Sequence, residues 1–255
     1  MSRVIVITGA SEGIGALLAK RQGGKGNALV LAARRKDKLE QIASECGSAT
    51  LTVVTDVTKR TQIERLRDAA LERFGHVDVW INNAGRGIGI RVMDFTEEDL
   101  DEMIAVNLKS AWYGMKAIIP HFQARGQGHL INISSVLGRV PLVPIRSAYS
   151  ASKAALNSLT ANLRMDLRAE YPGIHVSLIS PGPVSTEFHN NSLGGTPSGR
   201  GMEMQSVEQV VQVIESVIDK PVPDTYTNPS SARLVQRYFE GISGFEDEIV
   251  ARINK

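Results

Sequence analysis

Near its N-terminus the chain reads Val4-Ile-Val-Ile-Thr-Gly-Ala-Ser-Glu-Gly-Ile-Gly15. The apolar residues 4–7 predict a strand buried on both faces, and the glycines after it predict a tight turn into a helix over 14–23. Such a turn lets the backbone approach a pyrophosphate, and the helix N-terminus adds amide donors and a positive dipole. A turn without a ligand is the plainer interpretation, but its place directly after the first strand of an α/β sheet favours nucleotide binding.

The same alternation of strand and helix continues along the chain. The predicted strands are 4–7, 28–33, 51–54, 77–81, 129–133 and 174–179, and the predicted helices are 14–23, 36–46, 59–74, 97–125, 149–171 and 206–219. This order predicts an α/β fold, a single-domain doubly wound parallel sheet of the Rossmann type flanked by helices on both faces. Ligands of such sheets bind at the carboxyl ends of the strands, so the residues after each strand are the candidates for a site.

Size and composition fit one such domain over residues 1–255. Hydrophobic residues make up 42% of the chain and charged residues 22%, and the net charge of +2 is too small to indicate nucleic acid. No apolar run approaches the roughly 18 residues of a spanning helix and no signal peptide precedes the first strand, so we expect a cytoplasmic protein without a membrane partner. With Cys46 as the single cysteine and no metal-ligand spacing among the histidines, no metal site is expected.

Two arginines follow the second predicted strand. In NAD sites the position about 20 residues after the glycine turn is acidic and holds the ribose 2′-hydroxyl, but this chain has Arg34 and Arg35 there. A solvated helix start is the alternative interpretation, yet cations at a helix N-terminus oppose its dipole unless an anion lies among them. Arginine binds phosphate bidentately, so the sequence favours NADP(H), with Arg34 on the 2′-phosphate and Arg35 as its neighbour or stacking partner.

Other strand ends carry polar or turn-forming residues. Asp56, followed by Val57, could accept a hydrogen bond from an adenine amino group or merely cap a helix. Asn82-Asn-Ala-Gly85 could close a turn without a ligand, and Asn107 lies in a predicted helix for which asparagine has poor propensity. The remaining strand ends are followed by Ser134-Ser135 and by Pro181-Gly-Pro-Val-Ser-Thr186.

A tyrosine and a lysine, Tyr149 and Lys153, lie four residues apart in the predicted helix 149–171. Residues at this spacing share one helix face, with about 5–6 Å between their β-carbons. An ammonium group held beside a phenol lowers the phenol's pKa from its ordinary value of about 10, which makes it a usable proton donor and acceptor near neutrality. Because this spacing is common on solvated helices, the pair alone is weak evidence for a catalytic site, and the residues around it have to support that interpretation.

Together these residues resemble the short-chain dehydrogenase/reductase family, in its short branch. The ordered set is specific, although each element alone could arise by chance. The matching elements are Thr8-Gly9-x3-Gly13-x-Gly15, Asp56-Val57, Asn82-Asn-Ala-Gly85, Asn107, Ser135, Tyr149-x3-Lys153 and Pro181-Gly-x-Val184-x-Thr186.

The resemblance implies a nicotinamide cofactor and a catalytic tetrad. Tyr149 would exchange a proton with the substrate oxygen, Lys153 would lower the tyrosine's pKa and hold the nicotinamide ribose, and Ser135 would hydrogen-bond the substrate oxygen. Asn107 would bend its helix and keep a water in the proton relay. Negative charge builds on a carbonyl oxygen during hydride transfer, and two hydroxyl donors there would stabilise it. The implied cofactor site comprises Gly9, Ser11, Glu12, Gly13, Ile14, Gly15, Arg34, Arg35, Asp56, Val57, Asn83, Ala84, Gly85, Tyr149, Lys153, Pro181, Gly182, Val184 and Thr186.

Three features depart from the family pattern. Ser135 and Tyr149 are fourteen residues apart, one more than is common, and Ser134 competes with Ser135 for the role. The chain also lacks the Val-Asp-Gly-Gly ending of many tetrameric members, which puts one tetramer interface in doubt. We expect a homodimer or homotetramer, with helices 97–125 and 149–171 available for a dimer interface and a C-terminal extension at about 228–255.

The substrate side of the site is predicted to be apolar. Residues 140–145 predict an apolar wall, and a flexible lid is predicted at about 186–205, around a glycine-rich stretch. Such a pocket suits a ketone or aldehyde with a hydrophobic body. Four arginines on segments expected to rim the site leave open an anionic substrate, against the alternative of solvated surface charges: Arg86, Arg91, Arg139 and Arg146.

The sequence is compatible with three functions. The favoured one is an NADP(H)-dependent oxidoreductase, of class EC 1.1.1.-, that interconverts a carbonyl and an alcohol. A non-redox, epimerase-like enzyme on this fold is disfavoured because the chain keeps the short-branch glycine turn and shows no added substrate domain. A non-catalytic nucleotide-sensing scaffold is disfavoured because both Tyr149 and Lys153 are present.

Overall fold

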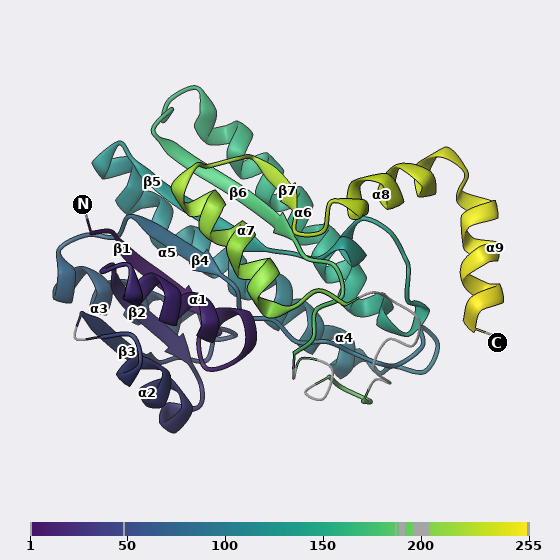
Figure 1. Ribbon diagram of the computed structural model, residues 1–255, viewed down its shortest axis with the longest axis horizontal. Coiled ribbons are helices and arrows are strands. Elements are labelled where there is room, and N and C mark those ends of the chain that lie inside the picture. The colour runs from purple at the N-terminus through teal and green to yellow at the C-terminus, as the bar shows by residue number, and fades with distance from the viewer. Residues whose placement is uncertain (1, 48, 187, 189–191, 196–203, 254–255) are drawn as a thin grey trace.

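The structure is a computed structural model that describes residues 2–47, 49–186, 188, 192–195 and 204–253 (Figure 1). More than half of the predicted lid at 186–205 therefore lies outside the described residues. Within the described part of the chain, none of the helices combines the length and apolarity that crossing a membrane requires.

A seven-stranded sheet forms the centre, in the order β3-β2-β1-β4-β5-β6-β7, and every neighbouring pair is parallel. The order runs outward from β1 in both directions, which places the topological switch between β1 and β4. The predicted doubly wound parallel sheet is confirmed. The strands are β1 (Val4–Thr8), β2 (Ala28–Ala33), β3 (Thr50–Val54), β4 (Val79–Asn82), β5 (Gly128–Ile133), β6 (Ile174–Ser180) and β7 (Asp224–Tyr226).

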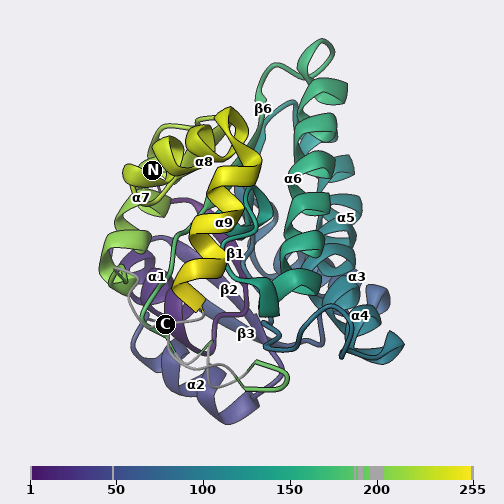
Figure 2. The ribbon, with the colours of Figure 1, turned by 90° about the vertical axis from the view of Figure 1, so that its right-hand side faces the viewer.

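Helices cover both faces of the sheet because alternate side chains of the buried strands point to opposite faces. Ile5 and Ile7 of β1 pack into one core with α1, α2 and α7, whereas Val4 and Val6 pack into a second core with α3, α5 and α6. Figure 2 shows these two layers on either side of the strands. The helices are α1 (Gly13–Gly24), α2 (Lys36–Ser44), α3 (Arg60–Phe74), α5 (Ser110–Arg125), α6 (Ser147–Arg168) and α7 (Val207–Asp219).

The predicted helix 97–125 is not one regular helix. It consists of α4 (Glu97–Ile104), a π-helical turn (Ala105–Lys109) and α5. Asn107 lies in that π turn, where its side-chain amide bonds to the backbone of Arg86 rather than pointing to solvent. A π turn inside a helix often marks a functional position. The resemblance implied that Asn107 bends its helix, and the π turn is the irregularity that the structure shows there. The prediction of a single continuous helix is wrong.

The C-terminal part contains elements that the sequence did not predict, namely β7, α8 (Ser230–Glu240) and α9 (Ile242–Ile253). After β7, α8 leads away from the sheet and α9 follows at the end of the chain (Figure 1). Phe245 and Ile249 of α9 are buried in a small core with Val136, Val140 and Leu142, which follow β5. The C-terminal helix is therefore packed against the segment between β5 and α6.

Candidate active site

The glycine turn after β1 is pressed against the turn after β4. Gly9 has a φ of +68°, and a β-carbon on it would lie 2.9 Å from the Cα of Ala84. A β-carbon on Gly15 would lie 2.4 Å from the carbonyl oxygen of Gly9. Glycine is thus required at both positions by space, and at Gly9 also by backbone conformation. The bare backbone and the start of α1 at Gly13 form the kind of cradle that accepts phosphate groups.

Asn83 and Thr8 hold these two turns together. The Asn83 Nδ2 donates to the carbonyl oxygens of Thr8 and Gly9 at 2.9 and 3.3 Å. The Thr8 Oγ1 accepts from the backbone N–H groups of Asn83 and Ala84 at 3.0 and 3.2 Å. The predicted cofactor residue Asn83 therefore also has a supporting role, in shaping the glycine turn.

Asp56, after β3, has a local role as well. Its Oδ1 accepts from the N–H and the hydroxyl of Thr58 at 3.0 and 2.7 Å. These bonds form a local turn rather than the helix cap that the sequence left open as the alternative, because α3 begins at Arg60 with Lys59 as its N-cap and without a side-chain cap. Asp56 and Val57 nevertheless line the same cavity as the glycine turn.

The two arginines after β2 approach the glycine turn from its other side. The Arg35 Nη2 lies 2.5 Å from the Glu12 Oε2 and 3.3 Å from the Ser11 Oγ. Arg34 and Arg35 are both exposed and both line the cavity. Arg34 and the ion pair of Arg35 with Glu12 therefore border the end of the cavity that contains the glycine turn.

One cavity of about 1200 Å³ joins the predicted residues. It contains Ser135, Tyr149 and Lys153 together with every predicted cofactor residue except Gly15, which lies behind Gly9. Asn107 is buried and is not among the lining residues; its Oδ1 accepts from the Arg86 N–H and its Nδ2 donates to the Arg86 carbonyl, both at 2.9 Å. Asn107 thus supports the wall of the cavity from outside.

Tyr149 and Lys153 are both buried on α6. The Lys153 Nζ donates to the carbonyl oxygen of Ile133 at 2.8 Å, and it lies 5.8 Å from the centre of the Tyr149 ring. This bond ties α6 to the end of β5. Burial lowers the pKa of Lys153 to about 8.

The pKa of Tyr149 differs from the prediction. Burial raises it, while a hydrogen bond with the Ser135 side chain and the charge of Arg146 act in the opposite direction. The sequence predicted that Lys153 would lower this pKa, but in the structure the cost of charging a buried phenol is the larger effect. The charge of Arg146, which the sequence had placed only at the rim, opposes this effect of burial.

Ser134 and Ser135 are separated by the direction of their side chains. Both serines line the cavity, but the Ser134 Oγ donates to the Asn157 Oδ1, and the Asn157 Nδ2 donates to the carbonyl oxygen of Gly138 at 3.0 Å. The Ser135 Oγ accepts from the Leu137 N–H at 3.1 Å and is hydrogen-bonded with Tyr149. The geometry favours Ser135, as predicted. Asn157 was missed, although it lies four residues after Lys153 on the same face of the helix.

The other end of the cavity is largely apolar. Leu142, Val143 and Ile145 line it, as the predicted wall at 140–145 requires. Phe188 and Met204, which belong to the segment predicted as a lid, also line the cavity, and so do Ile249 and Arg252, which sequence reasoning missed. Ile249 belongs to α9, a hundred residues beyond Tyr149, and no local pattern in the sequence connects the two.

The four rim arginines lie in different surroundings. Arg86 forms an ion pair with Glu102, and Arg139 forms one with Asp224. Arg91 is exposed and is not among the residues that line the cavity. Arg146 is only 5% exposed and lines the cavity near Tyr149. For Arg146 the interpretation as a solvated surface charge is wrong.

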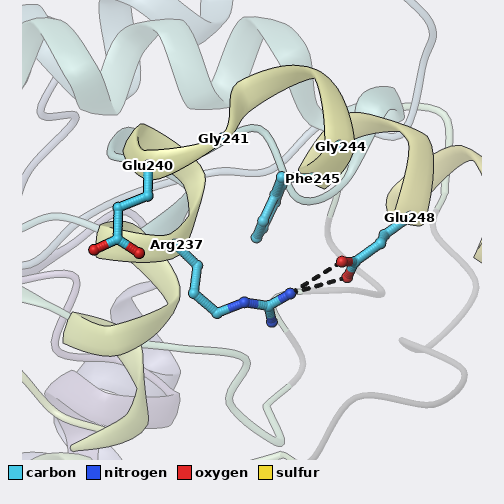
Figure 3. Close-up of a pocket in the computed structure, with 6 residues that line it drawn as sticks. All are labelled: Arg237, Glu240, Gly241, Gly244, Phe245 and Glu248. Atoms are coloured by element: carbon cyan, nitrogen blue, oxygen red, sulfur yellow. Dashed lines mark hydrogen bonds and ion pairs between the residues drawn. The ribbon is translucent and has the colours of Figure 1, made fainter.

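A second, smaller hollow of about 300 Å³ lies where α8 meets α9 (Figure 3). There the Arg237 Nη2 donates to both carboxylate oxygens of Glu248 at 3.1 Å, beside the ring of Phe245. This ion pair joins the two helices. We assign the hollow a structural role, and the chemistry to the cavity at the strand ends, where the hydroxyl and ammonium groups converge.

Comparisons with known proteins agree with this geometry. The family model for short chain dehydrogenases matches residues 3–194. An uncharacterized oxidoreductase of Staphylococcus epidermidis is 34% identical over 211 residues, covering 82% of this chain and 89% of that protein. The alcohol dehydrogenase from the archaeon Thermococcus sibiricus, complexed with 5-hydroxy-NADP, is 31% identical with a TM-score of 0.78, over 89% of this chain and 96% of that chain. A short-chain dehydrogenase/reductase from Burkholderia phymatum, in complex with NAD, is 27% identical with a TM-score of 0.87, over 95% and 94%.

The fold and the cavity define a Rossmann-type α/β protein with a glycine turn suited to a dinucleotide. The chain belongs to the short-chain dehydrogenase family and is an oxidoreductase of that family. Its own residues fit the nicotinamide dinucleotide that the family implies. The glycine cradle would be filled by any β-carbon on Gly9 or Gly15, the start of α1 offers amide donors, and the cavity continues from Arg34 to Tyr149.

Proposed function

We propose that this protein is an NADP(H)-dependent oxidoreductase that interconverts a ketone or aldehyde and the corresponding alcohol. One observation carries the proposal. The hydroxyl groups of Ser135 and Tyr149 and the ammonium group of Lys153 lie in the same cavity as the glycine turn and the basic pair after β2.

In this proposal each residue has a distinct task. NADPH, when bound along the glycine turn, supplies the hydride. Tyr149 donates its phenolic proton to the substrate oxygen, and Ser135 hydrogen-bonds the same oxygen, so that two donors meet the charge that develops there. Lys153 adds positive charge beside the phenol and would hold the nicotinamide ribose. Asn107 holds the backbone of Arg86, which lines the cavity.

The preference for NADP(H) rests on Arg34 and Arg35. Solved relatives contain an NADP derivative in one case and NAD in another, so family membership alone leaves the choice open. The two arginines border the end of the cavity with the glycine turn, and a 2′-phosphate there would receive charge-assisted hydrogen bonds. No carboxylate follows β2 at these two positions to hold a free 2′-hydroxyl.

The proposed substrate has a hydrophobic body. Leu142, Val143 and Ile145 form one apolar wall of the cavity, and Phe188 and Ile249 contribute further apolar surface. A pocket of this composition, with two hydroxyl donors, orients a carbonyl group and excludes water from the rest of the molecule.

We also propose that the protein is a cytoplasmic homodimer or homotetramer. Exposed apolar side chains on α5 and α6 support an interface over these helices: Trp112 is 41% exposed, Leu159 39% and Met165 63%. Light scattering of the purified protein measures the assembly, and charged substitutions at Trp112 and Met165 are expected to dissociate it.

A panel of uncharged ketones and aldehydes, with NADPH oxidation followed by absorbance, tests the activity. We expect turnover of hydrophobic members by the wild type and none by Tyr149→Phe, which should still bind NADPH because the substitution removes one hydroxyl group only. A panel without turnover by a wild type that binds NADPH would instead support the non-catalytic scaffold. Undiminished turnover by Tyr149→Phe would contradict the assigned mechanism.

A further inference from the structure

Arg146 is an unusual residue for the wall of an apolar cavity. It ends the short 3-10 turn before α6, three residues ahead of Tyr149, and it is 5% exposed. Burial lowers the pKa of its guanidinium, yet arginine keeps its charge in proteins. A buried cation carries a large desolvation cost, and this one lies three residues ahead of the proposed proton donor, where its charge bears on the ionisation of the phenol.

Phe188 connects Arg146 to the tyrosine. The ring of Phe188 meets the Tyr149 ring edge to face, with 5.6 Å between centres and 64° between planes. The guanidinium carbon of Arg146 lies 5.8 Å from the centre of the Phe188 ring, within cation–π distance. The three side chains therefore form a continuous row from the guanidinium to the phenol.

Gly87, in the segment after β4, leaves the space that this row occupies. A β-carbon on Gly87 would lie 2.4 Å from the Ser192 Oγ, 2.6 Å from the Arg146 Nη1 and 2.9 Å from the Phe188 Cε1. Glycine here lets the segments after β4 and β6 close around the guanidinium.

Backbone bonds keep those two segments together. Gly89 N–H donates to the Leu193 carbonyl at 2.7 Å, and Leu193 N–H donates to the Gly87 carbonyl at 3.0 Å. These two hydrogen bonds form a parallel β-bridge between Ile88 and Leu193. Phe188 packs in the same apolar cluster as Ile88 and Leu193 and also contacts Arg146.

The charges around Tyr149 come from several elements. Lys153 lies on α6 itself, and Arg86, which follows β4, is paired with Glu102 of α4. The segment after β5 presents the Ser135 hydroxyl, and the described part of the segment after β6 presents the uncharged ring of Phe188. The charge of Arg146 favours the ionised form of the phenol, the Lys153 Nζ lies 5.8 Å from the centre of the same ring, and Arg252 of α9 also lines the cavity.

We propose that Arg146 is a positioning residue for Tyr149, which seats Phe188 against the tyrosine ring and places a fixed positive charge beside the phenol. This proposal rests on Tyr149 acting as the proton donor described above. It requires only that the guanidinium stays where the structure has it, whatever other contacts its five donors make.

The first test follows the titration of Tyr149 without using turnover. Phenolate absorbance of the wild type minus that of Tyr149→Phe reports this one phenol, and the same difference is measured in an Arg146→Gln and an Arg146→Lys background. We expect Arg146→Gln to raise the titration midpoint of Tyr149 by about one pH unit, the lower end of the effect of a neighbouring opposite charge. Arg146→Lys keeps a positive charge and should return the midpoint most of the way to its wild-type value. Arg91→Gln, at an exposed arginine, is the matched control. Coincident midpoints for Arg146→Gln and wild type would overturn the proposal.

The second test separates the charge from the ring contact. With an uncharged ketone as substrate, reduction by Arg146→Gln should keep its activity to higher pH than the wild type, because the proton donor loses its proton later. Phe188→Leu retains the cation and loses the ring, so we expect a lower kcat with an unmoved alkaline limb. If Arg146→Gln impairs only anionic ketones and leaves both kcat and the pH profile for the uncharged ketone unchanged, the residue binds substrate and the proposal is wrong.

The outcomes also distinguish this proposal from the proposed function. If Tyr149→Phe turns over as well as the wild type, the assigned proton donor is wrong. If Tyr149→Phe is inactive while the Arg146→Gln profile matches the wild type, only the role of Arg146 fails.

Discussion

The side-chain amide of Asn107 bonds to the backbone of Arg86 on both sides, with its Oδ1 accepting from the Arg86 N–H and its Nδ2 donating to the Arg86 carbonyl, each at 2.9 Å. Asn107→Leu retains the size and leaves both backbone groups without this partner. We expect a loss of about 1–3 kcal/mol in the free energy of unfolding, measured in urea. Asn162→Leu, at an exposed asparagine of α6, should change stability little. Equal stabilities of the two variants would contradict the assigned role.

Arg34→Ala tests the choice of cofactor. If Arg34 binds the 2′-phosphate, its loss should weaken NADPH by about 1.5–3 kcal/mol, the range for hydrogen bonds to charged groups, and leave NADH nearly unchanged. Fluorescence titration gives both dissociation constants. Lys38→Ala is the matched control, because Lys38 is an exposed cation of α2 that is not among the cavity residues. A wild type that binds NADH more tightly than NADPH would contradict the preference.

Gly15→Ala and Gly24→Ala compare two glycines of α1. A β-carbon at Gly15 meets the Gly9 carbonyl oxygen at 2.4 Å, whereas one at Gly24 meets nothing within 4 Å. Gly15→Ala should displace the glycine turn and weaken NADPH by at least about tenfold, or about 1.4 kcal/mol. Gly24→Ala should bind NADPH like the wild type. Thermal melts of both variants show whether the loss at Gly15 extends to the whole fold.

Ile249→Ala tests whether α9 forms part of the substrate site. Ile249 is 9% exposed and lines the cavity, while the next residue, Val250, is 54% exposed. We expect Ile249→Ala to raise KM for bulky ketones about tenfold, the lower end of the effect of lost apolar contacts in a pocket, with an unchanged dissociation constant for NADPH. Val250→Ala should leave both constants unchanged. A KM unaffected by Ile249→Ala would place α9 outside the substrate site.

Stability should depend on pH through Lys153. Its pKa is about 8 in the folded protein and 10.5 without the fold, so between these values the unfolded chain binds more protons and stability rises with pH. Below pH 8 the buried Lys153 must carry its charge in the folded protein, so the full destabilisation is present there. As the pH rises toward 10 the folded protein releases this proton and the destabilisation decreases. The expected slope is at most about 1.4 kcal/mol per pH unit. Urea unfolding at several pH values should show this slope in the wild type and a smaller one in Lys153→Met; parallel curves would contradict it.

The sequence predicts those parts of the fold that depend on local pattern. Strands such as β1 and β2 are continuous apolar runs, and a helix face such as that of Tyr149 and Lys153 follows from spacing alone. The three-residue strand β7 is too short to show a hydrophobic period, so its sequence does not predict a strand. It is a strand because it pairs with β6. The poor helix propensity of Asn107 left a bend in the predicted helix 97–125 open, but the π turn found there is accompanied by hydrogen bonds to Arg86, twenty-one residues away.

By itself the sequence determined the parallel sheet, the glycine turn and the set of residues at the strand ends, because each of these is encoded within a strand, a turn or one helix face. Only the tertiary structure decided that Ser135 rather than Ser134 meets the tyrosine, that Arg146 is buried beside it, and that α9 lines the cavity. Those outcomes depend on which distant segments pack together. Burial then raises the pKa of Tyr149, and the spacing of residues along the chain does not predict how deeply a side chain is buried.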